Sequence, residues 1–364
     1  MREIIKIGDQ EKIENFISKL KEKKPLFICV IGNTETAKIP GISAAGANPE
    51  ITDYTPAADV EYLEFRRCKC IDGVPVTPDG IPTPGLITKA SLEIANIPNL
   101  TVVGGVKILP EVPFLELGGK SGGNISNGQA VEEPKKVFKN ALILGKNLSK
   151  LADYLVIGES IAGGTTTALG VLHAMGYDAT DKISSSLPIN PIELKIDAIK
   201  SGMKANNISK GDLKDNPFQA IEYLGDPMQP AHAGITIGAA SNIPVILAGG
   251  TQMSAILALI KKIKPNVLEN IAIGTTRWIV DDKNTDLKGI VDQINPNTPI
   301  LAANLDFSRM KAQGLQAYEM GVVKEGVGAG GSVISCLLSS QGAITIESIH
   351  KRIEKDYDLI TNHD

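Results

Sequence analysis

The sequence predicts an α/β fold in which an open parallel sheet carries helices on both of its faces. Short apolar runs without polar alternation recur along the chain, as expected for strands that are buried on both sides. Helical patterns lie between several of these runs, and most of the runs end at glycine. The predicted strands are residues 27–31, 101–103, 155–157, 245–247, 271–273 and 300–301. Ligands of such sheets bind at the carboxyl ends of the strands, where these glycines cluster.

The amino-terminal part predicts a helix, a strand and a long irregular segment. Asp9 is expected to cap the helix, whose apolar residues recur at i, i+3, i+4 and i+7. These residues are Ile13, Phe16, Ile17 and Leu20. Residues 33–84 are dense in proline and glycine, and a long segment of this kind is usually functional or disordered. The aromatic and charged cluster at residues 62–67 favours an ordered segment that helps to build a site.

Three later helices are predicted from capping and periodicity. Residues 191–205 follow Asn190, which is expected to be the cap, with proline at the first helical position. Residues 251–263 carry apolar residues on one face. A last helix is expected to start at Thr345 and to bury its isoleucine face.

Residues 155–176 predict an anion-binding site. They combine a strand, a glycine-rich turn that carries Glu159, a second glycine pair and a helix start. The free N–H groups of such a helix start and the positive end of its dipole favour a phosphate. The predicted contacts are Gly158, Gly163, Gly164, Thr165 and Thr166. The alternative is an ordinary tight turn, because the loop matches neither the dinucleotide pattern nor the Walker A pattern, whose lysine is missing here.

Two glutamates lie beside glycine-rich helix starts. Glu159 is in the loop just described, and Glu325 is in a second glycine-rich run at residues 324–332. A pair of carboxylates suits glycosidic-bond chemistry, in which one stabilises an oxocarbenium-like ribose and the other moves a proton. The alternative is that both are acids at helix amino ends, stabilised by the dipole.

A second candidate anion site consists of Ser184, Ser185, Ser186 and Lys195. Serine hydroxyls bind phosphate, and a lysine one turn into the following helix can reach back as a point charge. The alternative is that Lys195 is an ordinary surface lysine. Thr275 and Thr276 follow another predicted strand, and they place hydroxyl groups at the same edge of the sheet.

Composition excludes several classes of function. A net charge of −4 and a pI of about 5.7 over 364 residues give no electrostatic case for binding nucleic acid or an anionic membrane. No apolar run is long enough to cross a bilayer and the amino end is unlike a signal peptide, so a cytoplasmic protein is expected. Cys68 and Cys70 have no second cysteine pair or nearby histidine, so no metal site is expected.

Five segments, in this order along the chain, are similar to motifs of one enzyme family. GISAAGANPEIT at residues 41–52 resembles a G-V-S-x-Y-P-x-x-V-T segment. GESIAGGTTT at 158–167 resembles a G-E-x-G-x-x-N-T-T loop, and SSSLPINPIELK at 184–195 aligns with G-x-G-T-G followed by a lysine. PVILAGGT at 244–251 aligns with P-V-x-x-D-G-F, and VKEGVGAGG at 323–331 resembles L-G-E-G-x-G-A. The chain therefore resembles the nicotinate-nucleotide–dimethylbenzimidazole phosphoribosyltransferase family of cobamide lower-ligand assembly.

This resemblance implies an architecture and a reaction. It implies a large Rossmann-like domain at residues 25–320 and a small helical domain formed by residues 1–24 and 321–364, in a homodimer. The implied enzyme moves 5-phosphoribose from nicotinate mononucleotide to a benzimidazole, with inversion at the anomeric carbon and release of nicotinate. The product is an α-riboside 5'-phosphate, and no metal or other cofactor is implied.

The resemblance also implies roles for single residues. Glu325 would take the proton of the attacking base, and Glu159 would hold the ribose and favour its cationic transition state. The glycine loop, Ser184, Ser185, Ser186 and Lys195 would hold the phosphate. Other implied substrate contacts are Gly249, Gly250, Thr275 and Thr276, with Ser43 on the acceptor base.

Departures from the family motifs leave two alternatives open. Serines stand in place of the Gly-Thr-Gly sequence, Ala248 replaces an aspartate, and the first loop lacks its aromatic residue. One alternative is a protein on the same fold that binds a mononucleotide without catalysis and has a regulatory role. The other keeps the transfer reaction but uses a different aromatic acceptor.

Overall fold

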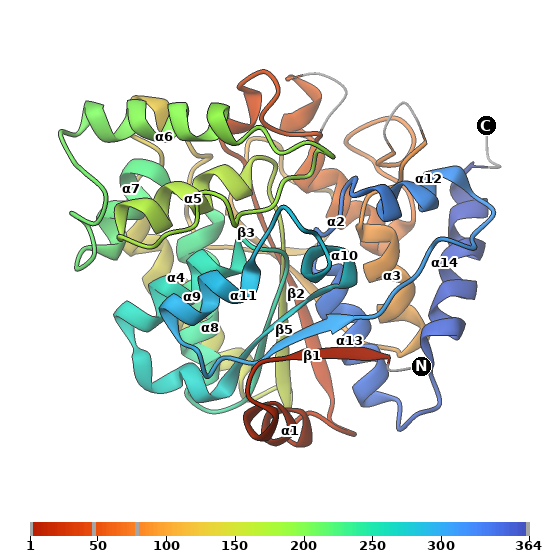
Figure 1. The fold of residues 1–364 in the computed structure, drawn as a ribbon. Coiled ribbons are helices and arrows are strands. Elements are labelled where there is room, and N and C mark those ends of the chain that lie inside the picture. Colours follow the sequence, from red (N-terminus) through yellow and green to blue (C-terminus); the bar gives the residue numbers. More distant parts are fainter. Residues whose placement is uncertain (1–2, 46–48, 77–79, 362–364) are drawn as a thin grey trace.

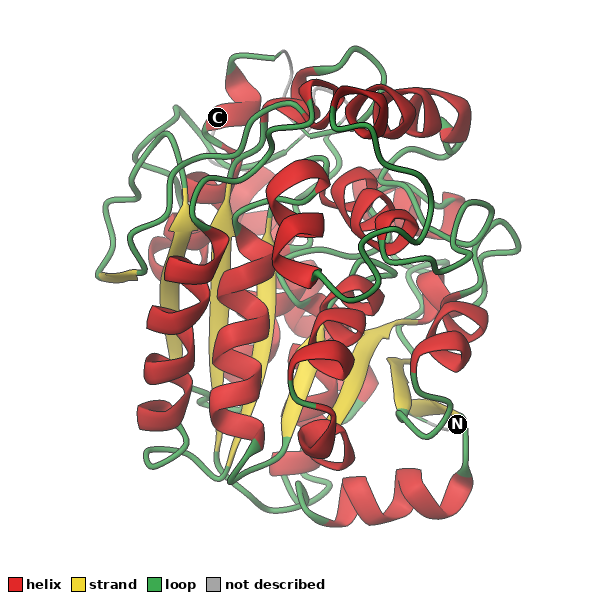
Figure 2. Ribbon diagram, turned by 90° about the vertical axis from the view of Figure 1, so that its left-hand side faces the viewer, coloured by secondary structure: helices red, strands yellow, loops and turns green. Residues whose placement is uncertain are grey.

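A computed structural model describes residues 3–45, 49–76 and 80–361 of the chain. In these residues a single eight-stranded sheet has the order β1-β8-β7-β6-β5-β2-β3-β4. Neighbouring strands pair in parallel except β1, which runs antiparallel to β8. Helices flank the sheet on both sides (Figure 2). The predicted α/β class is thus confirmed.

The strands are β1 (Ile4–Ile7), β2 (Pro25–Gly32), β3 (Asn99–Gly105), β4 (Phe114–Glu116), β5 (Tyr154–Ser160), β6 (Val245–Ala248), β7 (Ile271–Thr276) and β8 (Ile300–Ala303). All six predicted strands are present, within β2, β3 and β5 to β8. The apolar patterns did not predict β1 or β4. Both lie at edges of the sheet and are short, and neither contains a buried residue, so they lack the continuous apolar run of an internal strand.

The helices are α1 (Gln10–Ser18), α2 (Thr55–Phe65), α3 (Gly85–Ile94), α4 (Pro134–Leu148), α5 (Gly164–Ala174), α6 (Ile192–Ala205), α7 (Pro217–Leu224), α8 (Met228–Ala240), α9 (Met253–Ile263), α10 (Arg277–Val280), α11 (Leu287–Ile294), α12 (Gln313–Gln316), α13 (Ala329–Ser339) and α14 (Ile346–Thr361). Short 3-10 turns are η1 (Glu35–Lys38), η2 (Ile51–Asp53), η3 (Ile125–Asn127), η4 (Pro265–Asn270) and η5 (Ala317–Met320).

Two hydrophobic cores lie on opposite faces of the sheet, and β5 contributes to both. Leu155 and Ile157 pack into the core that contains the apolar residues of α5, α8 and α9. Tyr154 and Val156 belong to the other core, with those of α2, α3 and α13. Successive residues of a strand point to opposite faces, so every position of β5 before Glu159 must be apolar or small. This requirement explains the absence of polar alternation in the predicted strands.

The two ends of the chain contact each other. The N–H of Glu22 donates to the carbonyl oxygen of Leu338 at 3.1 Å, and the N–H of Ile346 donates to Glu3 Oε1 at 3.1 Å. Figure 1 labels the elements concerned, β1 and α1 near the amino end and α13 and α14 near the carboxyl end. The division into residues 25–320 and a small helical domain from residues 1–24 and 321–364 stays a prediction.

Local details of the amino-terminal prediction are confirmed in part. The Asp9 carboxylate caps α1 by accepting from the N–H of Lys12 at 3.0 Å. Residues 62–67, however, are not loop: they form the end of α2 and the turn after it. Almost every residue of α2 is buried, so the helix shows no amphipathic stripe from which it could have been predicted. Residues 46–48 and 77–79 of the irregular segment lie outside the described residues.

The predicted cap of α6 is wrong. The side-chain N–H of Asn190 donates to the carbonyl oxygen of Ile183 at 2.8 Å and caps nothing, and Pro191 takes the cap position. This bond draws the loop after Ile183 toward α6. The α9 helix begins at Met253, two residues after its predicted start.

The structure predicts that Gly330 cannot carry a side chain. A Cβ at this position in α13 would clash with the backbone of Thr275 in β7, which cannot move without disturbing the sheet. We expect Gly330→Ala to lower the free energy of unfolding by about 3 kcal/mol, measured by urea titration. Gly85→Ala is the control, because a Cβ there has its nearest neighbour at 3.4 Å. Equal stability of Gly330→Ala and wild type would contradict the packing described here.

Candidate active site

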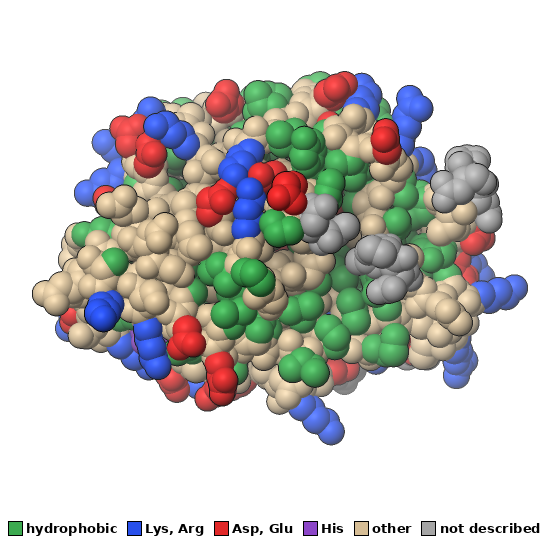
Figure 3. All heavy atoms as spheres, turned by 90° about the horizontal axis from the view of Figure 1, so that it is seen from above, with side chains coloured by type: hydrophobic (Ala, Val, Ile, Leu, Met, Phe, Trp, Pro, Cys, Tyr) green, Lys and Arg blue, Asp and Glu red, His purple; other side chains and the backbone are tan. Residues whose placement is uncertain are grey.

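A cavity of about 290 Å³ lies at the carboxyl ends of the parallel strands. Its wall is formed by the segment before α2, the β5–α5 loop, residues 184–186 and the loop before α13. Figure 3 looks onto the molecule from above, and hydrophobic side chains gather across the middle of this face. The position of the cavity agrees with the prediction that ligands bind at this edge of the sheet.

Ten of the sequence-predicted site residues line this cavity: Ser43, Glu159, Gly163, Gly164, Thr165, Ser184, Ser185, Ser186, Gly250 and Glu325. The other six do not line it: Gly158, Thr166, Lys195, Gly249, Thr275 and Thr276. Several of these six nevertheless hold a lining residue in place, as the contacts below show.

Glu159 lies at the end of β5, and its side chain is buried. The N–H of Ile161 donates to Glu159 Oε2 at 3.1 Å, and the N–H of Val327 donates to its carbonyl oxygen at 2.9 Å. The second bond joins β5 to the loop that carries Glu325. Gly158 permits this contact, because a Cβ there would lie 2.9 Å from the Cα of Gly328. Gly158 therefore acts in packing.

Glu325 is held by backbone donors at the start of α13. The N–H groups of Gly326 and Gly330 each donate to Glu325 Oε1 at 3.2 Å, and Thr275 Oγ1 donates to Oε2 at 3.4 Å. Thr276 Oγ1 donates to the carbonyl oxygen of Lys324 at 2.6 Å. The two threonines at the end of β7 thus position Glu325 and its loop.

Burial gives both glutamates an unusual affinity for protons. It raises the pKa of Glu325 to about 7, although backbone N–H groups oppose the shift. Burial, and then the nearby charge of Glu325, raises the pKa of Glu159 well above its usual range. Two carboxylates in one buried site resist being charged together. One of them therefore holds a proton near neutral pH while the other can accept one.

Lys195 is fully buried and has no ion-pair partner among the described residues. Its Nζ donates to Thr165 Oγ1 at 3.1 Å and to the carbonyl oxygen of Ser184 at 2.8 Å. It thus bridges the start of α5 and the loop of residues 184–186, which we call the serine loop. Burial, with the nearby charge of Lys324, lowers the pKa of Lys195 to about 7. The sequence alternative of a surface lysine is wrong, and an anion beside this group would stabilise its charged form.

The serine loop is fixed from two sides. Ser184 N–H donates to Thr251 Oγ1 at 2.8 Å, after the end of β6. The N–H of Ala44 donates to Ser186 Oγ at 3.1 Å, which ties the first loop and its Ser43 to the serines. Both loops therefore close over the cavity with the start of α5.

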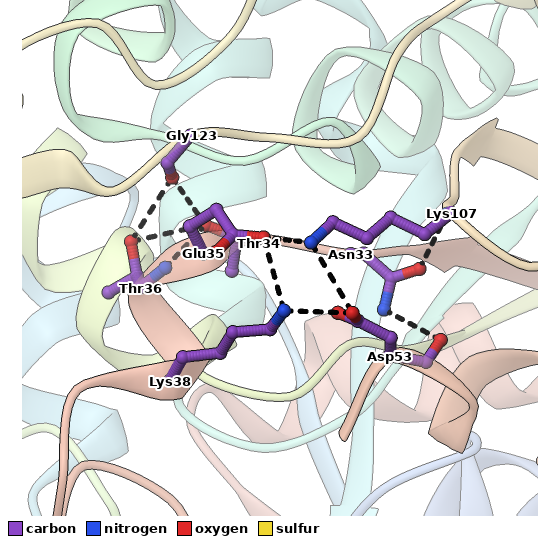
Figure 4. Close-up of polar contacts among 8 residues, drawn as sticks. All are labelled: Asn33, Thr34, Glu35, Thr36, Lys38, Asp53, Lys107 and Gly123. Atoms are coloured by element: carbon purple, nitrogen blue, oxygen red, sulfur yellow. Dashed lines mark hydrogen bonds and ion pairs between the residues drawn. The ribbon is translucent and has the colours of Figure 1, made fainter. Parts of the chain in front are cut away.

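A charged cluster anchors the first loop to the sheet (Figure 4). Lys38 Nζ contacts Asp53 Oδ2 at 2.8 Å, and Lys107 Nζ contacts both Asp53 Oδ2 at 3.3 Å and Glu35. Asn33 extends the cluster by donating to the carbonyl oxygen of Asp53 at 3.2 Å and accepting from the N–H of Lys107 at 2.9 Å. These bonds join η1 and η2 to the ends of β2 and β3.

Comparison with known proteins identifies the family. Residues 105–277 match the model of a family described as phosphoribosyltransferase. A UPF0284 protein of Methanothermobacter thermautotrophicus is 43% identical over 94% of each chain. One of Sulfolobus acidocaldarius is 46% identical over 94% of this chain and 98% of its own. This chain belongs to the UPF0284 protein family.

Solved structures share the fold of this UPF0284 chain. The crystal structure of CobT from Thermus thermophilus has a TM-score of 0.61 at 16% identity, covering 93% of this chain and 90% of its own. A nicotinate-nucleotide–dimethylbenzimidazole phosphoribosyltransferase from the same organism has a TM-score of 0.60 at 16% identity, covering 95% and 92%. The resemblance predicted from the motifs is thus confirmed.

Sequence reasoning missed two ionisable residues of the UPF0284 cavity, Asp59 and Lys324. Asp59 lies on α2, which the sequence patterns did not predict as a helix. The sequence feature that could have indicated Asp59 is that it is the one acidic residue among the apolar residues 56–60. Lys324 directly precedes Glu325, and its Nζ pairs with Asp282.

In the described part of the chain, no three His, Cys, Asp or Glu side chains are arranged to hold a metal, and no helix is long and apolar enough to cross a membrane.

The raised pKa of Glu325 predicts a pH-dependent stability. Between the usual value of 4.5 and about 7, the folded state binds more protons at Glu325 than the unfolded state does. The contribution of Glu325 to the free energy of unfolding therefore falls as pH rises through this range. Relative to Glu325→Gln, the wild type should lose on the order of 3 kcal/mol between pH 4 and pH 8. Urea titrations of both proteins across this pH range measure the change in the free energy of unfolding. A difference between the two proteins that stays constant with pH would contradict the raised pKa of Glu325.

Proposed function

We propose that this UPF0284 protein is a phosphoribosyltransferase that moves 5-phosphoribose from nicotinate mononucleotide to a benzimidazole-type base. The products would be an α-riboside 5'-phosphate, as used for the lower ligand of cobamides, and nicotinate. The observation that carries the proposal is that Glu159 and Glu325 line one cavity with a glycine-rich helix start, and that the buried Lys195 bonds to two residues of its wall. The family match over residues 105–277 supports the same reaction class.

The part of the cavity wall formed by the start of α5 and residues 184–186 suits the 5'-phosphate. At the start of α5, the N–H groups of Thr166 and Thr167 donate to the carbonyl oxygen of Gly163. Gly164 and Thr165 line the cavity, and their N–H groups would donate to an anion in front of the helix. Gly163 has a φ of +77°, which lets the loop turn tightly into this helix. Ser184, Ser185 and Ser186 face the same space, and Lys195 supplies a positive charge from behind. The phosphate would thus raise the pKa of Lys195 from its lowered value.

The two glutamates suit the two needs of the transfer. The glycosidic C–N bond breaks with its electron pair going to the nicotinate nitrogen, so the ring leaves without needing a proton. A ring nitrogen of the acceptor bonds to C1' from the opposite face, and Glu325 takes the proton from the other ring nitrogen. The pyridinium of the bound donor is a cation, which favours the ionised form of Glu159, and this carboxylate stabilises the positive charge that develops on the ribose. A pKa near 7 suits Glu325 to a base that works at neutral pH.

The alternative of a non-catalytic mononucleotide-binding protein rested in part on Ala248. Ala248 is fully buried against α13, because a Cβ at Gly331 would clash with it, and it does not line the cavity. In this protein the side chain at position 248 therefore packs against α13 and is not part of the cavity wall. The predicted homodimer stays a prediction.

The direct test is release of nicotinate from nicotinate mononucleotide, with and without an added base. We expect release that depends on a benzimidazole, together with a riboside phosphate of the combined mass detected by mass spectrometry. Binding of the mononucleotide without release, across a panel of bases, would support the regulatory alternative instead. Absence of both binding and release would refute the proposed function.

The role of Glu325 predicts a specific kinetic defect. Glu325→Gln should lower kcat about 100-fold or more, because a general base contributes at least this much, while KM for nicotinate mononucleotide changes about threefold or less. Glu347→Gln makes the same chemical change at an exposed ion pair with Lys351, and its kcat should equal that of wild type. A folded Glu325→Gln protein with wild-type turnover would exclude Glu325 as the base.

A further inference from the structure

Two sets of residues line the cavity, and we call the parts that they line its polar end and its apolar end. Glu159, Glu325 and the serine loop form the polar end, whereas residues 42–84 contribute the apolar wall. The apolar wall consists of Ile42, Ala44, Ala45, Ile51, Ala58, Ile71, Val74, Pro75, Val76, Ile81, Pro82 and Pro84. Such a wall suits a flat aromatic ring. Among the described lining residues of this segment, Asp59 has the only ionisable side chain.

The carboxylate of Asp59 is held firmly by two hydroxyl groups. Ser160 Oγ donates to Asp59 Oδ2 at 2.6 Å, and Thr83 Oγ1 donates to Asp59 Oδ1 at 2.7 Å. Ser160 belongs to the end of β5, next to Glu159, so Asp59 is tied to the rigid part of the site. Each carboxylate oxygen can accept a further hydrogen bond beyond the one it has here.

Asp59 is costly to bury in this way. It is 4% exposed and makes no ion pair with the described residues. Burial raises the pKa of Asp59 to about 6, so the carboxylate is mostly ionised at pH 7 to 8. A buried carboxylate that lacks a cation is stabilised by any further donor that reaches it. A ligand in the apolar end could supply such a donor.

We propose that Asp59 selects the acceptor base, favouring aromatic bases that carry an amino or hydroxyl donor on the ring edge over bases that carry only methyl groups there. The inference rests on the proposed function and names the class of its acceptor. The negative charge of Asp59 would repel the carboxylate of nicotinate, so the apolar end belongs to the acceptor. A methyl group at the same place would bury the carboxylate without a new partner.

The test compares 5-aminobenzimidazole with 5-methylbenzimidazole, which have nearly the same shape. With nicotinate mononucleotide as donor, wild type should show a kcat/KM about 10- to 100-fold higher for the amino compound, as expected for a hydrogen bond to a charged group. Asp59→Asn should reduce this ratio about tenfold, and Asp59→Ala should bring it close to one. Asp226→Asn is the matched control, because Asp226 is also buried with a pKa raised to about 6, yet it does not line the cavity. It should leave the ratio unchanged.

Two results would overturn the proposal. One is a wild-type ratio near one or in favour of the methyl compound, and the other is an equal loss with both bases in the Asp59 variants, which would indicate a structural role. If no base causes release of nicotinate, the proposed function fails, and equilibrium dialysis of the two bases then tests Asp59 by itself. Tighter binding of the amino compound that Asp59→Asn removes would still support the proposal, and equal binding would refute it.

Discussion

The site depends on the close contact between the end of β5 and the loop before α13. Gly158 and Gly328 approach so closely that neither can carry a side chain, and the N–H of Val327 bonds to Glu159. These two segments are far apart in the chain, and each brings one glutamate. Because the contact is made by backbone atoms, the separation of the carboxylates is set by the sheet and α13 and not by flexible side chains.

This contact also creates the electrostatic character of the cavity. It brings two acids into one cavity, and the loss of water around a charge is costly, so both carboxyl groups hold protons more strongly than in water. Behind Thr165 and Ser184 in the cavity wall, burial makes Lys195 release its proton more easily. The positive charge on the sugar ring of the reacting substrate would stabilise the ionised glutamates, and its negative phosphate would stabilise the charged form of Lys195. The charges of the site are therefore complementary to the transition state that we propose.

The sequence predicted much of the fold and the main residues of the site, for identifiable physical reasons. Internal parallel strands such as β5 are continuous apolar runs that end at glycine, and both glutamates lie beside glycine-rich helix starts. Buried α2 lacks an amphipathic face, so it and Asp59 were missed. The burial of Lys195 was also invisible, since it results from the packing of α6 against distant segments. Patterns report local periodicity, whereas these features arise from contacts between separated segments.

A crystal structure of the protein with nicotinate mononucleotide would test the central claim most directly. The account predicts that the phosphate lies between the amino end of α5 and Ser184, Ser185 and Ser186. It also predicts that the anomeric carbon faces Glu325 and that the apolar wall near Asp59 is left open for the acceptor. A phosphate bound at the apolar end, or a nucleotide bound outside this cavity, would contradict the assignment of the site.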